Sequence, residues 1–146
     1  MAYWRGTASQ QAQDDLDGLL DPALGFAQQQ LDAHGEFDPY AVVVDADGQQ
    51  RMVAADIGSD EPASADLITK LIATLSDERD NLRAAAIVAH IRLPETNSDA
   101  VRVTLEHSER VSLTVLLPYK ARQFGRGIDY GNLQASAATA FIWPAG

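Results

Sequence analysis

The stretch 100-AVRVTLEHSERVSLTVLLP-118 decides the fold of this chain. Apolar and polar residues alternate on both sides of a turn around Glu109, and a period of two is typical of a half-buried strand. If the two strands pair symmetrically about Glu109, the apolar residues of 101–107 share one face with those of 111–117. The stretch therefore predicts an antiparallel hairpin that packs one face against a helix and leaves the other at least partly in water.

Further segments have the composition of strands. Residues 40–44 and 51–56 flank the turn 45-DADGQ-49, which predicts a second hairpin. Residues 85–93 form another strand, and a short last strand is expected over residues 139–143. The turn does not match a calcium loop, because its glycine stands at the fourth position and such loops need it at the sixth.

Two segments have the spacing of amphipathic helices. Between residues 16 and 31, apolar residues recur at intervals of three and four, and Gly35 is placed to close the helix. Asp21 followed by Pro22 is typical of a helix start, so this segment is either one helix or two. The second helix is expected to begin at Ser64 and to end near Asp80.

The order of these elements is α-ββ-α-βββ, which predicts an α+β domain with an antiparallel sheet of about five strands and helices mainly on one face. A chain of 146 residues has the length of one domain, which we place at residues 14–146 behind a flexible arm of residues 1–13. The order is compatible with profilin-like and roadblock-like domains, although a shared fold does not transfer function.

Composition restricts the partners and the compartment. Twenty-one acidic against eleven basic residues leave a net charge of −10, which disfavours nucleic acid and membrane surfaces as partners. The chain has no cysteine, and neither a signal-peptide pattern nor a long apolar stretch is visible. We therefore expect a bacterial cytoplasmic protein without disulfides or thiolate metal sites.

The motif 35-GEFDPY-40, followed by the Asp-Gly turn at 47–48, the segment 100-AVRV-103 and the pair Pro118-Tyr119, carries a family resemblance. It resembles a group of small uncharacterised bacterial proteins of actinobacterial type, over about residues 16–130. The resemblance implies the same α+β order of elements. It implies no activity, because none is attached to that group.

Few residues are candidates for catalysis. The chain lacks the HExxH, GxSxG, GxGxxG and GxxxxGK[ST] motifs, so we predict no metal site and no cofactor. His90 is expected on the polar face of its strand near Glu106, where the two form an acid/base pair. Arg92 or Arg102 then holds an anionic substrate. The alternative is that these side chains only form a solvated face of the sheet. Both interpretations concern the same polar residues, which are His90, Arg92, Arg102, Thr104, Glu106, Ser112 and Thr114.

Two loops add candidates. Glu36 is a general-base candidate beside His34, with a plain loop position as the alternative. Lys120, Arg122 and Arg126 form a basic island that suits an anion or an acidic patch of a partner, with a solvated loop as the alternative.

Two functions are compatible with these observations. The preferred one is a non-enzymatic protein-interaction module, adaptor or immunity-like, that self-associates through the edges of its sheet. The alternative is a small enzyme or ligand-binding domain that uses the polar face of the sheet, with an unknown ligand.

Overall fold

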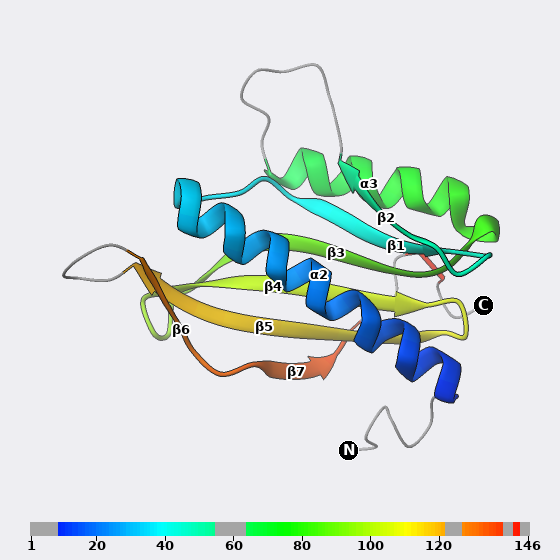
Figure 1. The fold of residues 1–146 in the computed structure, drawn as a ribbon. Coiled ribbons are helices and arrows are strands. Elements are labelled where there is room, and N and C mark those ends of the chain that lie inside the picture. Colours follow the sequence, from blue (N-terminus) through cyan, green and yellow to red (C-terminus); the bar gives the residue numbers. More distant parts are fainter. Residues whose placement is uncertain (1–8, 55–63, 122–126, 139–141, 144–146) are drawn as a thin grey trace.

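The computed structural model describes residues 9–54, 64–121, 127–138 and 142–143 (Figure 1). These residues form two α-helices, α2 (Gln10–His34) and α3 (Ser64–Glu78), and a short 3-10 helix, η1 (Arg79–Asn81). They also form one antiparallel sheet in which β2-β1-β3-β4-β5-β6 are neighbours and β7 also pairs with β5. The strands are β1 (Tyr40–Asp45), β2 (Gln50–Ala54), β3 (Leu82–Leu93), β4 (Ser98–His107), β5 (Val111–Ala121), β6 (Ile128–Tyr130) and β7 (Gln134–Ala137).

The hairpin expected over residues 100–118 is confirmed. His107 pairs with Val111 and Val101 with Leu117, so β4 and β5 are symmetrical about Glu109. Their apolar side chains belong to one buried cluster with residues of α2. Alternation of period two was therefore sufficient to predict both the register and the buried face.

The two helices cover opposite faces of the sheet, and the expectation of helices mainly on one face is wrong. In Figure 1, α2 crosses in front of the sheet and α3 lies behind its upper part. Val42 and Val88 pack with α2, whereas Val43 and Ile87 belong to a second cluster with leucines of α3. The reason is visible in β1 and β3, which are apolar at consecutive positions and therefore bury both faces.

Helix α2 is one helix and continues through Pro22. Proline has no N–H, so the carbonyl of Gly18, four residues earlier, loses its helical partner. The side-chain amide of Gln50 in β2 donates to this carbonyl at 2.9 Å. Gly35 closes the helix with a φ of 76°, as expected. The N-cap is Ser9, which accepts from the N–H of Ala12, and not Asp21.

Other boundaries differ from the expectation. Helix α2 begins at Gln10, inside the range expected for an arm, and Ala12 is buried. Strands β6 and β7 were not predicted, and they are only three and four residues long. Most of the expected strand at 139–143 lies outside the described residues, and Ile142 is buried without belonging to a strand. None of the described helices has the length and apolarity to cross a membrane.

Candidate functional site

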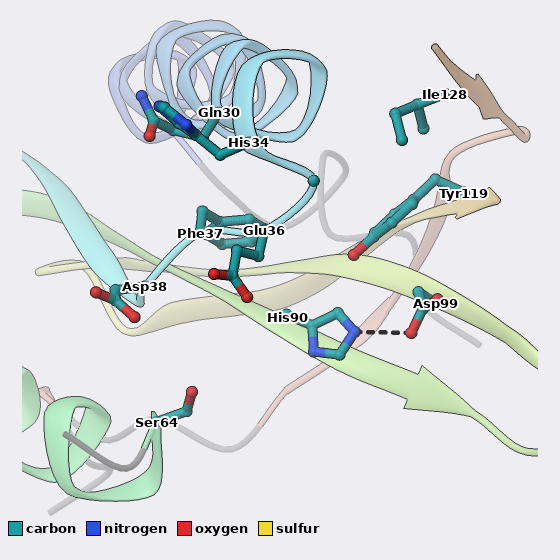
Figure 2. Close-up of a pocket in the computed structure, with 11 residues that line it drawn as sticks. Gln30, His34, Glu36, Phe37, Asp38, Ser64, His90, Asp99, Tyr119 and Ile128 are labelled. Atoms are coloured by element: carbon teal, nitrogen blue, oxygen red, sulfur yellow. Dashed lines mark hydrogen bonds and ion pairs between the residues drawn. The ribbon is translucent and has the colours of Figure 1, made fainter. Parts of the chain in front are cut away.

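A groove of about 630 Å³ lies at the end of the sheet where α2 finishes. Its walls are the last turn of α2, the loop from α2 to β1, and the ends of β3, β4 and β5 (Figure 2). Ser64 at the start of α3 and Ile128 at the start of β6 also line it. The volume is in the range of ligand sites for small molecules, which is roughly 300–1,000 Å³.

The loop of the groove is held by aromatic contacts. Gly35 ends the helix in a left-handed conformation, and Phe37 packs edge-on against Tyr40, with ring centroids 6.0 Å apart. The buried hydroxyl of Tyr40 donates to the carbonyl of Ala23 in α2. Because Phe37 is partly buried, its neighbours Glu36 and Asp38 are left exposed on the groove side.

A row of polar side chains crosses the strands beneath this loop. Arg92 on β3 stands opposite Asp99 on β4, Asp99 opposite Tyr119 on β5, and Tyr119 opposite Tyr130 on β6. The row continues the face that α2 covers elsewhere, but it lies past the end of the helix. Polar side chains can therefore occupy positions that would otherwise be apolar.

Asp99 is the centre of an ion-pair network. Its Oδ1 lies 2.8 Å from Nε2 of His90, and its Oδ2 lies 3.3 Å from Nη1 of Arg92. Arg92 also donates to the side-chain oxygen of Asn97. The hydrogen bond from His90, aided by that from Arg92, outweighs burial and lowers the pKa of Asp99. Asp99 is therefore a carboxylate whose charge is already compensated.

Tyr119 is the most buried polar side chain that lines the groove. The residue is 7% exposed, and Figure 2 shows its hydroxyl directed toward the space beside His90. The hydroxyl has no hydrogen-bond partner among the described residues, and its ring centroid is 6.3 Å from that of His90. Burial, together with the charge of Asp99 and the neighbouring Tyr130, raises the pKa of Tyr119 to about 12. The hydroxyl is therefore a neutral group, able to donate or accept a hydrogen bond.

Glu36 and Asp38 are the other charged groups of the loop. Both are exposed, and neither forms an ion pair with a described residue. In Figure 2 the carboxylate of Glu36 extends toward His90, whereas His34 lies back along α2 beside Gln30. The structure thus brings two of the sequence candidates, Glu36 and His90, to one groove.

No protein-family model, curated protein or solved structure matches this chain. The groove must therefore be interpreted from its own chemistry.

His90 and Glu106 do not form the expected pair. His90 stands opposite Val101, whose side chain is on the α2 face, whereas Glu106 is on the face toward α3. The sequence did not reveal this, because β3 is apolar at consecutive positions and so lacks the alternation that would assign His90 to a face. Arg102 is also on the α3 face, where it lines a separate cavity of about 250 Å³.

Glu106 has a structural position. It is 2% exposed, and its two carboxylate oxygens accept from the N–H of Ile142 at 3.1 and 3.0 Å. Arg79 donates to the carbonyl of the same residue at 3.3 Å. The Ile142 side chain is buried in the cluster of α3, so these contacts hold Ile142 against the sheet.

The basic island is described only in part. Lys120 is exposed near the end of β5, whereas Arg122 and Arg126 lie outside the described residues. Within the described ranges, no group of three or more histidine and acidic side chains is placed to hold a metal ion.

Sequence reasoning missed a buried cluster at the other end of the sheet. Asp15 of α2 lies 2.7 Å from Nε2 of His107 and 2.6 Å from Nη2 of Arg83. The only signal was a histidine on the apolar face of β4 and an aspartate next to the apolar stripe of α2. Neither identifies its partner, because the contacts connect residues far apart in the chain.

Proposed function

We propose that this protein is a non-enzymatic binding module, adaptor-like in its role, and that the groove at the end of α2 is its ligand site. The observation that carries the proposal is the hydroxyl of Tyr119. A residue that is 7% exposed presents a polar group to a cavity of about 630 Å³, and no described residue satisfies it. The hydroxyl opens onto the groove, so it is accessible to a ligand or to water as a hydrogen-bond partner.

Binding is favoured over catalysis by the state of the other polar groups. His90 is hydrogen-bonded to Asp99, and Asp99 forms an ion pair with Arg92, so these groups are already partnered within the protein. Among the described residues Ser64 lines the groove without a hydrogen bond to His90, so no activated nucleophile is present there. His90 and Glu106, both described, lie on opposite faces of the sheet, so the pair on which the enzymatic hypothesis depended does not form.

Amide-resolved NMR tests the proposal with a panel of small molecules that spans the charge classes. Anionic, neutral and cationic compounds are titrated in turn into the isotope-labelled protein. We expect at least one class to shift the amides of Gly35, Phe37, His90 and Tyr119 and to leave those of the β4–β5 turn unchanged. If no class shifts the groove amides, the groove is not a ligand site and the proposal is wrong.

Self-association is part of the proposed role as an interaction module. Strand β2 is an edge of the sheet among the described strands, and Met52 on it is 48% exposed. Exposed edge strands accept a second chain readily. We expect light scattering to give a dimer mass, which Met52→Lys converts to a monomer. The control is Leu133→Lys, at another large apolar residue that is exposed. A wild-type protein that is monomeric at every concentration would contradict self-association.

A second candidate function is acid–base catalysis by His90, which the 2.8 Å contact with Asp99 favours because such a contact orients the imidazole. NMR of a bound ligand over time would detect its conversion. Conversion that His90→Gln abolishes and Glu95→Gln, at an exposed position that does not line the groove, preserves would favour this candidate.

The cytoplasmic location and bacterial origin are also proposals. The sequence without cysteine supports the first, because disulfides are rare in reducing compartments. The second depends on the family resemblance alone.

A further inference from the structure

We propose that the ligand of the groove is a small organic cation that carries an ammonium or guanidinium group. This inference rests on the proposed function, in which the groove is a ligand site. It adds the chemical class of the ligand, which follows from the charges and the rings that line the cavity.

The charged groups of the groove that lack an ion-pair partner among the described residues are carboxylates. Glu36 and Asp38 carry carboxylates that form no ion pair with any described residue. Asp99, in contrast, forms an ion pair with Arg92 and a contact with His90. The whole chain has a net charge of −10, so the long-range field also attracts cations.

An anionic ligand would find no free positive group of comparable strength among the described residues of the groove. Arg92, the arginine nearest to Asp99, is bound by Asp99 and Asn97. An anion would have to displace these contacts and approach the carboxylate of Glu36, which extends toward His90 (Figure 2). The cost of bringing like charges together makes this arrangement unfavourable.

The aromatic and apolar walls suit an organic rather than an inorganic cation. Phe37 and Tyr119 both line the groove, and aromatic ring faces attract ammonium and guanidinium groups. The neutral hydroxyl of Tyr119 can accept a hydrogen bond from an N–H of the ligand. Ile128 adds an aliphatic wall for a short alkyl chain. A bare metal ion is a poorer fit, because the described residues present no metal-binding group of three ligands.

The same chemistry has two sources, a free amine or guanidine and a basic side chain of a partner protein. Agmatine, which has both cationic groups on a butyl chain, represents the first source. A blocked Gly-Arg-Gly tripeptide represents the second. Calorimetry and NMR with each probe give the affinity and the location of binding, and tighter binding by one of them identifies the source.

The charge of the groove is tested by a double variant, Glu36→Gln with Asp38→Asn. We expect the affinity for agmatine to fall about tenfold, because two charge-assisted contacts are lost. The matched control is Glu95→Gln, an exposed glutamate in the β3–β4 turn with no ion pair among the described residues. Raising NaCl from about 20 mM to about 300 mM should weaken binding to the wild type more than to the double variant.

The hydroxyl is tested by Tyr119→Phe, with Tyr130→Phe as the control because Tyr130 does not line the groove. Because Tyr130 contacts Tyr119, a second control is Ser108→Ala, which removes an exposed hydroxyl in the β4–β5 turn. We expect Tyr119→Phe to weaken agmatine binding about fivefold and Ser108→Ala to leave it unchanged. Thermal melts identify any variant that fails to fold. In that case Glu36→Gln alone, at an exposed position, still tests the proposal.

The outcomes separate this inference from the proposed function. Succinate binding at the groove amides without agmatine or peptide binding would overturn the cation inference and leave the groove as a ligand site. Agmatine binding that is unaffected by the double variant would also overturn it. If no probe of any charge class shifts the groove amides, both proposals are wrong.

Discussion

The carboxylate of Asp15, near the start of α2, lies 2.7 Å from Nε2 of His107, at the end of β4. The backbone N–H of Glu109 donates to Nδ1 of the same imidazole, so Nε2 is the nitrogen that carries a proton toward Asp15. Arg83 on β3 completes the cluster. One helical residue thereby connects α2 with two strands at the end of the sheet opposite the groove.

Replacing Asp15 should destabilise the fold strongly. Asp15→Ala leaves the polar nitrogen of His107, a residue that is 2% exposed, without its acceptor. We expect a loss of about 2–4 kcal/mol in the free energy of unfolding, less than for a fully buried pair because the Arg83 side chain is 30% exposed. Urea denaturation measures it. Asp21→Asn, at an exposed position of the same helix, should change stability by less than about 0.5 kcal/mol.

The contribution of Asp15 should depend on pH in the acid range. Burial acts to raise its pKa, but the hydrogen bonds from Arg83 and His107 outweigh burial and lower the pKa below the ordinary value of 3.8. A depressed folded-state pKa gives stability that is fully present above the unfolded value and is lost as the pH falls through the folded value. The stability difference between wild type and Asp15→Asn should therefore be constant near neutral pH and shrink below about pH 4. A difference that grows on acidification would contradict this assignment.

The contribution of Gln50 to stability should depend on Pro22, because the side chain of Gln50 binds the Gly18 carbonyl that proline leaves without a helical donor. Gln50→Ala removes the donor that replaces the missing N–H of proline, and we expect a loss of about 0.5–1 kcal/mol. In a Pro22→Ala background the helix can satisfy this carbonyl itself, so the same substitution should cost almost nothing. Urea denaturation of the four proteins gives the coupling energy, with Gln49→Ala as the control. Equal costs in both backgrounds would show that the contact does not compensate for proline.

Glu106 should control the hydrogen exchange of the Ile142 amide. In Glu106→Ala the N–H of Ile142 loses its buried acceptor, so its hydrogen exchange should accelerate about ten- to hundredfold. Glu106→Gln retains one acceptor oxygen and should give a smaller effect. The amides of β3 and β4 are the internal reference. Unchanged exchange at Ile142 in both variants would mean that the apolar packing of its side chain alone holds this residue in place.

The local elements were predictable because short-range periodicity produces them. Alternation over 100–118 was enough for the β4–β5 register, and leucine spacing with Gly35 was enough for the existence and end of α2. The same patterns indicated that the segments from 40 to 44 and around 85 to 89 are apolar throughout. Strands that are apolar on both sides imply a sheet with a helix on each face, and the structure has this arrangement. The prediction of helices mainly on one face missed this implication.

The groove was decided by tertiary structure. Glu36 in a loop and His90 in a strand were both recognised as candidates, yet their common site depends on where α2 ends relative to the sheet. The partner of His90 is Asp99, on the neighbouring strand, because the register of β3 and β4 places it there and directs Glu106 to the other face. The face on which a side chain lies and the residue it stands opposite both depend on pairing with neighbouring strands. The local sequence of a strand without alternation does not reveal them.

By itself, therefore, the amino-acid sequence determined both helices, the five longer strands, the acidic charge and the absence of cysteine chemistry. Only the tertiary structure decided which polar groups meet. It joined Asp15 to His107 over 92 positions of the chain, and it left Tyr119 facing a cavity with no described partner. The physical reason is that helices and strands form from local spacing, whereas sites form from contacts between residues that only packing brings together.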